Sequence, residues 1–275
     1  MRRAAALVLL LVALFALAGP PLARALAGLD GTAQDVLLGA TPPSWRHPFG
    51  TDVLGRDLLV RTMDGGAIAI RIGLTATAVA LVIGVGWGAL AGYAGGRLDE
   101  LLMRVVDVLY ALPATVFVIV VMALVSSRNE VLLFALIGGI SWLTLARIVR
   151  AQVRGLRHRE FVEAARGLGA TPTRVVWRHI LPNAVGPIVV YTTLLVPGVL
   201  LQEAFLSFLG LGVQPPRASW GTLIAEGARQ LAVYPWTLAA PGALMAVTIF
   251  ALNVVGDGLR DAVSGHGQPT GPAKS

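Results

Sequence analysis

Cysteine is absent from this chain of 275 residues, and charged residues make up only 13% of it. The absence of cysteine excludes disulfides, iron–sulfur clusters and thiolate zinc sites. A soluble globular domain has about 25% charged residues, so a chain with half that share cannot cover a water-facing surface in the usual way. Because 56% of the residues are hydrophobic and the mean hydropathy is +0.74, the sequence predicts an integral membrane protein.

Lysine is nearly absent as well, since Lys274 is the sole lysine in the chain. A phosphate-binding loop needs a lysine inside a glycine-rich motif, and no such motif surrounds Lys274. Any ATP hydrolysis connected with this chain is therefore expected on another polypeptide. The four histidines, at positions 47, 158, 179 and 266, lack the spacing of metal ligands. No resident metal or cofactor is expected in this chain.

Six stretches with little charge are candidates for membrane-spanning helices, each of which needs roughly 20 apolar residues. They are residues 4–23, 72–96, 108–127, 131–146, 184–202 and 231–256. The predicted fold class is therefore an all-α membrane protein with six transmembrane helices. Because the first stretch follows two arginines and ends in small residues, a cleaved signal peptide is the alternative to a retained helix.

The distribution of charge orients these spans. Residues 147–178 contain eight arginines and two glutamates, a net charge of +6, whereas five arginines and five aspartates cancel within residues 24–71. Cytoplasmic loops carry the excess of basic residues. The loop that contains residues 147–178 is therefore predicted to be cytoplasmic, and the loop of residues 24–71 is predicted to be external. Six crossings then place both termini in the cytoplasm. A basic loop is also the common topology signal or contact for anionic lipid, so its charge alone assigns no function.

Two short helices with a sharp bend are predicted inside the basic loop. The first runs from Glu160 to a stop at Gly169, and the second begins with Thr171 as cap and Pro172 in the first helical position. Apolar residues at helical spacing give each helix one apolar face. These faces are formed by Phe161, Ala164, Ala165 and Leu168, and by Val175, Val176, Trp177 and Ile180. An amphipathic elbow of this kind indicates a docking surface.

At these residues the chain resembles the permease subunits of ATP-binding-cassette (ABC) importers. Their signature is Glu-Ala-Ala, three residues, Gly, nine residues, Ile, one residue and Leu-Pro. Here it is matched by Glu163-Ala164-Ala165, Gly169 and Leu181-Pro182. His179 replaces the isoleucine, which is common in the peptide and nickel branch. Further motifs within residues 47–57, 99–113, 206–221 and 256–261 extend the resemblance over residues 47–262, and they resemble the second permease chain of dipeptide, oligopeptide and nickel importers.

The resemblance implies a type I ABC importer permease fold in a bacterial inner membrane. It divides the chain into a transmembrane helix (1–23), an external segment (24–67), a transmembrane domain (68–262) with a coupling loop (151–183), and a flexible cytoplasmic tail (263–275). In the family the elbow is the coupling helix. Glu163, Ala164, Ala165 and Gly169 would therefore contact an ATPase subunit, and Leu181 and Pro182 would start the next span.

The resemblance also implies partners and a cargo. The partners are a homologous second permease subunit, two ATPase subunits that bind ATP and Mg²⁺, an extracytoplasmic binding protein and membrane lipid, with no nucleic acid. The cargo is a dipeptide or oligopeptide, and a nickel chelate is the alternative. An ion-coupled secondary transporter would be expected to have inverted repeats and acidic residues near mid-span, and an intramembrane enzyme would need paired catalytic residues. Neither pattern is evident, so a non-catalytic transport subunit is predicted.

Several polar residues outside the elbow have two possible roles. Asp52, Arg56 and Asp57 could contact cargo or a binding protein, although turn and cap roles are favoured. Glu203, at the outer end of the fifth span, could line the translocation path or form an internal salt bridge. For Asp107 and Asn253, solvated or helix–helix polar contacts are favoured. Residues 207–234 are predicted to form a re-entrant or surface hairpin that acts as an external gate or serves packing alone.

Overall fold

The computed structural model describes residues 1–125 and 130–265, and their regular secondary structure is helical apart from one β-bridge between Thr51 and Asp57. The elements are α1 (Arg2–Ala27), α2 (Leu58–Ala94), α3 (Gly96–Ala111), α4 (Ala114–Val125), α5 (Glu130–Leu156), α6 (Glu160–Gly167), α7 (Pro172–Arg174), the π-helical turn η1 (Val175–Ile180), α8 (Leu181–Phe208), α9 (Trp220–Ala228) and α10 (Trp236–Gly265). Five helices are long and apolar enough to cross a membrane, and this count treats α7, η1 and α8 as one helix. The bent pair α3–α4 makes a sixth span when it is counted as one. The prediction of six spans agrees with this count.

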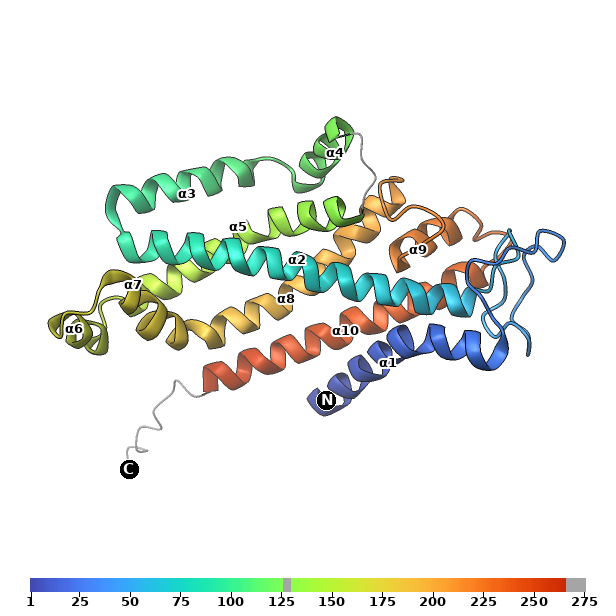
Figure 1. Cartoon of the computed structure of the whole chain (residues 1–275), viewed down its shortest axis with the longest axis horizontal. Helices are drawn as coiled ribbons and strands as arrows, with labels where there is room; N and C mark the ends of the chain where they lie inside the picture. The colour runs from blue at the N-terminus through green and yellow to red at the C-terminus, as the bar shows by residue number, and fades with distance from the viewer. Residues whose placement is uncertain (126–129, 266–275) are drawn as a thin grey trace, which may run out of the picture.

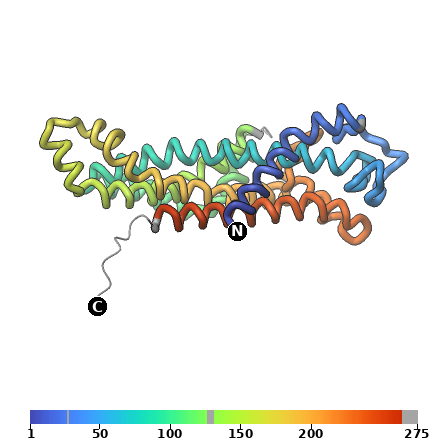
Figure 2. Tube along the Cα trace, turned by 90° about the horizontal axis from the view of Figure 1, so that it is seen from below, coloured from blue at the N-terminus to red at the C-terminus, as the bar shows by residue number. Residues whose placement is uncertain are grey.

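The long helices lie side by side along the longest axis of the molecule (Figure 1). Helices α6 and α7 project at one end, called here the elbow end, and residues 28–57 form the opposite end, called the loop end. The elongated shape is also clear in the perpendicular view (Figure 2). The last turns of α10 run toward the elbow end, and there Arg2 Nη2 lies 2.6 Å from Asp261 Oδ2. The beginning of α1 and the end of α10 are thereby held together.

Most helices extend beyond the apolar stretches that predicted them. The stretch 72–96 belongs to α2, which begins at Leu58, and the stretch 131–146 belongs to α5, which continues to Leu156. The stretch 231–256 was placed too early, because a turn precedes Trp236, where α10 begins. The predicted tail 263–275 starts with the end of α10, and its residues 266–275 lie outside the described part.

The span predicted over residues 108–127 is not a continuous helix in the structure. Helix α3 already begins at Gly96, and α3 and α4 meet at an angle of 82°. The break is explained by Pro113, which lacks an N–H and disfavours a helical conformation of the residue before it. Leu112 is accordingly extended, with φ −80° and ψ 130°. Residues 126–129 of this stretch lie outside the described residues.

Small residues let α2 and α5 pack closely along much of their length. Gly84, Gly88 and Gly92 lie on one face of α2 at helical spacing. A Cβ at Gly84 would lie 2.9 Å from Leu145 Cβ, and one at Gly92 would lie 2.7 Å from the Arg150 carbonyl oxygen. Backbones of membrane helices approach this closely only where side chains are minimal. This α2–α5 pair is the central support of the fold.

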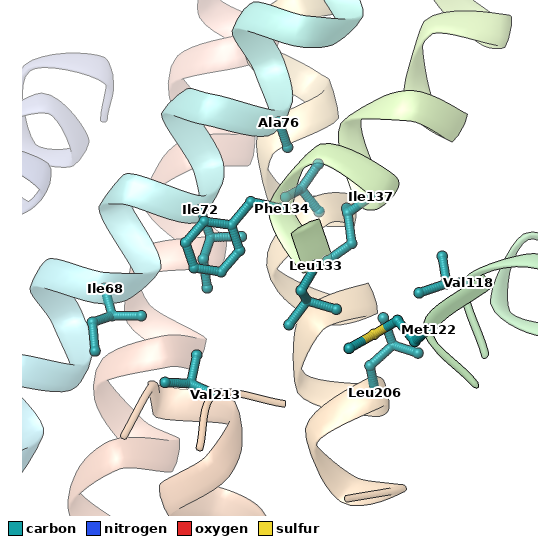
Figure 3. Packing of buried hydrophobic residues seen from close by; sticks show 11 residues of the cluster. Ile68, Ile72, Ala76, Val118, Met122, Leu133, Phe134, Ile137, Leu206 and Val213 are labelled. Atoms are coloured by element: carbon teal, nitrogen blue, oxygen red, sulfur yellow. The ribbon is translucent and has the colours of Figure 1, made fainter. Parts of the chain in front are cut away.

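A buried hydrophobic cluster ties further helices to this pair (Figure 3). Ile72 of α2 and Phe134 of α5 meet in it, and Met122 of α4 packs near Leu206 of α8. Val213, from the segment after α8, closes the cluster toward the loop end. The short helix α4 is thereby fixed against α5 and α8 although a sharp bend separates it from α3.

Asp57 caps the first turn of α2. Its Oδ1 accepts a hydrogen bond from the Val60 N–H at 2.9 Å, and His47 Nδ1 lies 2.8 Å from its Oδ2. We expect Asp57→Ala to lower the free energy of unfolding by about 1 kcal/mol, because a cap oxygen is lost. Asp57→Asn keeps such an oxygen and should lose less than half as much. Unfolding titrations with SDS in mixed micelles measure both values, and equal losses in the two variants would contradict the capping role.

Candidate coupling elbow and translocation region

The elbow has the helix–bend–helix form that the sequence predicts. Helix α6 ends at Gly167, and Gly169 takes a left-handed conformation with φ +83°, which favours glycine. Thr171 Oγ1 then accepts a hydrogen bond from the Arg174 N–H at 3.4 Å, and Pro172 occupies the first helical position. The chain continues without interruption through η1 into α8. The predicted bend at Gly169 and the predicted cap at Thr171 are confirmed.

The apolar face predicted for α6 is divided in the structure. Val162 is buried in a cluster with α5 and η1, and Ala165 is buried as well, whereas Phe161, Ala164 and Leu168 are exposed. The spacing predicted a single apolar face. In the structure Ala165 is buried, so this face does not point in one direction. Leu168 is 90% exposed and Trp177, on η1, is 62% exposed. The elbow thus offers large apolar side chains that its own chain leaves uncovered.

The other signature residues flank this surface. The side chain of Glu163 is exposed on the first turn of α6, next to Ala164. Leu181 is the first residue of α8 and is buried, and Pro182 follows in its first turn, as predicted. The signature therefore combines exposed residues with buried ones. Glu163, Ala164, Gly169 and Pro182 are exposed, whereas Ala165 and Leu181 are buried.

Basic side chains connect the elbow end to α2 and α3. The Arg166 guanidinium lies 5.2 Å from the centre of the Tyr93 ring, and Arg157 Nη1 donates to the Tyr93 carbonyl oxygen at 3.3 Å. Arg150 Nη2 lies 2.7 Å from Asp99 Oδ2, which joins α5 to α3. Part of the +6 charge is thus used in structural contacts. Arg166 thus links α6 to the end of α2, and Arg150 links α5 to the first turn of α3.

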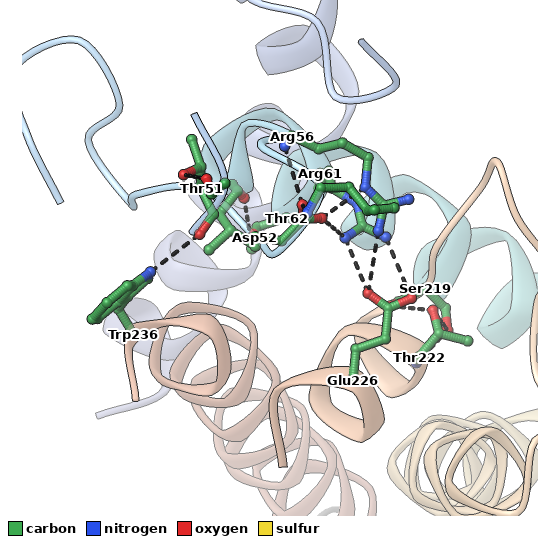
Figure 4. A network of polar contacts seen from close by, with 12 residues as sticks. Thr51, Asp52, Arg56, Arg61, Thr62, Ser219, Thr222, Glu226 and Trp236 are labelled. Atoms are coloured by element: carbon green, nitrogen blue, oxygen red, sulfur yellow. Dashed lines mark hydrogen bonds and ion pairs between the residues drawn. The ribbon is translucent and has the colours of Figure 1, made fainter. Parts of the chain in front are cut away.

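At the loop end, a network of ion pairs centres on Asp52 (Figure 4). Asp52 Oδ1 accepts hydrogen bonds from the backbone N–H groups of Leu54 and Arg56, while its Oδ2 lies 2.7 Å from Arg56 Nε and also pairs with Arg61. Arg61 Nη1 lies 3.0 Å from Glu226 Oε2 on α9. The predicted turn and cap roles of Asp52, Arg56 and Asp57 are confirmed. Sequence reasoning missed Glu226, because nothing local marks a partner 165 positions away.

Glu203 lies between α8 and α9 and is only 2% exposed. The hydroxyls of Ser207 and Ser219 donate to its Oε1 at 2.7 and 2.6 Å. The predicted internal salt bridge is not found among the described residues, because the carboxylate is bonded to hydroxyls and not to a cation. Its place in the translocation path stays a prediction. The arrangement anchors the beginning of α9 on α8.

The hairpin predicted over residues 207–234 contains α9 and is more deeply packed than expected. Trp220 is 1% exposed, and its indole N–H donates to the Thr62 carbonyl oxygen of α2 at 2.8 Å. Leu223 is also buried, in a cluster with α1, α8 and α10. Of the two roles predicted for this segment, the burial of these residues agrees with packing, because they fill the space between α1, α2, α8 and α10.

Two polar residues outside the elbow have simpler surroundings. Asp107 Oδ1 accepts from Arg147 Nη2 at 2.8 Å, and the Arg147 guanidinium also lies 4.2 Å from the centre of the Tyr110 ring. The favoured helix–helix contact of Asp107 is thus confirmed. Asn253 is exposed on α10.

The fold and the elbow define a class of protein: the chain belongs to the family described as binding-protein-dependent transport system inner membrane component, whose pattern matches residues 84–265. It is therefore a permease component of such a system, and the predicted family is shown. Among its relatives, the chain is 45% identical to the oligopeptide transport system permease protein OppC of Bacillus subtilis over 94% of this chain and 83% of that protein. It is 45% identical to OppC of Escherichia coli K12, over 94% and 85% of the two chains.

Two further comparisons agree with this class. The dipeptide transport system permease protein DppC of Bacillus subtilis is 43% identical over 81% of this chain and 69% of that protein. In fold, the chain is similar to a chain of the methionine ABC transporter MetNI in an inward-facing conformation, with a TM-score of 0.54 over 75% of this chain and 96% of that chain. At 18% identity this likeness shows the fold alone. The predicted ABC importer permease fold is thus shown.

Proposed function

We propose that this chain is one of two permease subunits of an ATP-driven importer of dipeptides or oligopeptides. The elbow is the observation that carries the proposal, because Leu168 and Trp177 form an uncovered apolar surface around the Glu163 signature. The names of the relatives, oligopeptide and dipeptide permeases, support a peptide cargo over a nickel chelate. The chain itself would perform no covalent chemistry.

The proposed partners follow from this role. ATPase subunits, which carry ATP and Mg²⁺, would cover the elbow, and a homologous permease would complete the path across the membrane. The elbow end is cytoplasmic in this proposal, because the basic loop of residues 147–178 lies there. The Arg2–Asp261 pair joins the start of α1 to the end of α10, which runs toward the elbow end, so both termini would be cytoplasmic. An external binding protein would deliver cargo at the loop end.

Coupling would use the contacts of the elbow. Closure of the ATPase subunits would shift α6, and the contacts of Arg166 and Arg157 with Tyr93 would pass this shift to the end of α2. Arg150 and Asp99 would pass it on to α3. Since α2 continues to the loop end as one helix of 37 residues, motion at the elbow can reach the external side. Alternating access of the path is the result.

Reconstitution of the complete importer tests this function. The tagged chain is purified with its associated subunits, which are identified by mass spectrometry, and the complex is placed in vesicles with its binding protein. We expect ATP-dependent uptake of radiolabelled di- or oligopeptides at a rate at least tenfold above vesicles without ATP, and no comparable uptake of a nickel chelate. Uptake of the chelate alone, or peptide uptake driven by an ion gradient without ATP, would overturn the proposal.

A further inference from the structure

A cavity of about 380 Å³ lies where α3 breaks into α4, against α5 and α8. Its polar lining residues are Tyr110, Ser141, Thr144 and Gln202. Pro113 and Gly198 also line it, and the remaining lining residues are apolar. No charged side chain lines it. Its size falls in the range of ligand pockets, roughly 300–1,000 Å³. Broken helices at membrane depth are tolerated where they line a cavity or are buried in protein, so the bend at Pro113 is placed where a transported molecule could pass.

Gln202 is the polar residue of this cavity whose contacts are incomplete. Its side-chain nitrogen Nε2 is shielded from solvent and has no hydrogen-bond partner in the described residues. Leaving such a donor unpaired costs about 1–3 kcal/mol of stability. Because polar groups inside a membrane span cost free energy, those that are present commonly mark functional sites. The neighbouring Glu203 differs, since it accepts hydrogen bonds from two hydroxyls. The Gln202 amide nitrogen is therefore a donor at the wall of this cavity that has no partner among the described residues.

The other polar groups of the cavity are neutral. Ser141 Oγ donates to the Ile137 carbonyl oxygen at 2.9 Å, which leaves its oxygen able to accept a hydrogen bond. Thr144 lines the same wall one helical turn further along α5. Donors and acceptors without charge, on an apolar wall, match the main-chain amides of a peptide.

We propose that this cavity binds the main chain of peptide cargo in transit, and that the Gln202 amide donates to a peptide carbonyl oxygen there. The inference rests on the proposed function, because it takes the cargo to be a peptide. Main-chain recognition agrees with the absence of charged lining residues, because the amide groups that peptides with different side chains have in common are neutral. Gln202 is then a residue for cargo recognition, adjacent to the structurally engaged Glu203.

Gly198 provides a test of occupancy. It lines the cavity on α8, and a Cβ built on it meets nothing within 4 Å, so a larger side chain enters the cavity without a clash. Gly242 on α10 is a matched control, because a Cβ there also meets nothing within 4 Å. In vesicles containing the complete importer, Gly198→Leu should reduce peptide uptake at least tenfold, and Gly242→Leu should stay within twofold of wild type. Gln202→Met, similar in length but without the amide, should reduce uptake about five- to tenfold.

A covalent probe separates occupancy from a structural effect. Because the chain has no cysteine, Gly198→Cys provides the sole thiol of this subunit. A peptide carrying a haloacetyl group, first shown to bind the binding protein, should label Gly198→Cys during ATP turnover at least tenfold faster than Gly242→Cys. An excess of unmodified peptide should suppress this labelling.

The two levels of the proposal fail differently. If the wild-type importer takes up no peptide, the proposed function fails. If wild type takes up peptide while Gly198→Leu and Gln202→Met do so at the wild-type rate, the cavity is not on the path and the inference is overturned. Equal labelling of the two cysteine variants overturns it as well, and this readout also decides the matter if Gln202→Met does not assemble.

Discussion

Replacing Arg61 by methionine is expected to lower the free energy of unfolding of this subunit by about 3 kcal/mol. The Arg61 side chain is 3% exposed and pairs with Asp52, itself 7% exposed, and with Glu226. Removal of one partner from a buried ion pair costs about 3–5 kcal/mol because the remaining charge is left without full compensation. The lower end applies here, since Arg56 still pairs with Asp52 in the variant.

Unfolding by SDS in mixed micelles measures this loss, and two further variants interpret it. Arg229→Met removes an exposed arginine at the end of α9 and should change stability by no more than about 0.5 kcal/mol. Adding Asp52→Asn to Arg61→Met should recover part of the loss, because the uncompensated carboxylate is then gone. Equal losses from Arg61→Met and Arg229→Met would show that the network does not stabilise the loop end.

The loop-end network also explains why the start of α2 could not be predicted from hydropathy. Arg61, Asp64 and Arg71 lie within the first turns of this helix, so the apolar stretch begins only at Ile72. These charges belong to a helix because partners elsewhere accommodate them. Arg61 pairs with Glu226, and Arg24 Nη2 lies 3.5 Å from Asp64 Oδ2. Such partners are distant in the sequence, and hydropathy carries no information about them.

Local signals predicted the elbow well because its shape depends on local chemistry. A glycine at position 169 and the pair Thr171-Pro172 determine the bend and the restart from their own backbone preferences. The burial of Val162, by contrast, depends on how α6 lies against α5 and η1. The spacing of apolar residues predicted a face but could not say which part of it the protein itself would cover.

The same difference applies to the candidate translocation region. Glu203 attracted attention as an acidic residue near the end of a span, yet Ser207 and Ser219 satisfy it. Its neighbour Gln202 is uncharged and gives no signal in hydropathy or charge. Only the packing of α3, α4, α5 and α8 shows that Gln202 lines a cavity and that its amide nitrogen has no partner among residues 1–125 and 130–265. The charge of Glu203 drew attention to this turn of α8, whereas the geometry of the cavity indicates Gln202 as the residue proposed to bind cargo.

The elbow leads to the prediction with the largest expected effect on transport. Gly169→Asp should leave the subunit inserted in the membrane but reduce ATP-dependent uptake at least tenfold, because it places a new negative charge on the proposed ATPase contact and replaces glycine at φ +83°, where every L side chain is less favourable than glycine. Glu163→Arg should have a similar effect, since it reverses an exposed charge on α6 without disturbing a buried contact. Uptake and ATPase activity stimulated by the binding protein, measured in the same vesicles, should fall together.

Gly167→Ala is the matched control for the elbow. Gly167 ends α6, its φ lies outside the left-handed region, and a Cβ there meets nothing within 4 Å, so alanine fits without strain. Uptake by this variant should remain within twofold of wild type. If Gly169→Asp and Glu163→Arg kept wild-type uptake and stimulated ATPase activity, the elbow would not be the coupling site. If instead they lost uptake but retained full stimulation, the elbow would transmit motion to the spans without being needed to activate the ATPase, and the contacts of Arg157 and Arg166 with Tyr93 would be the next to vary.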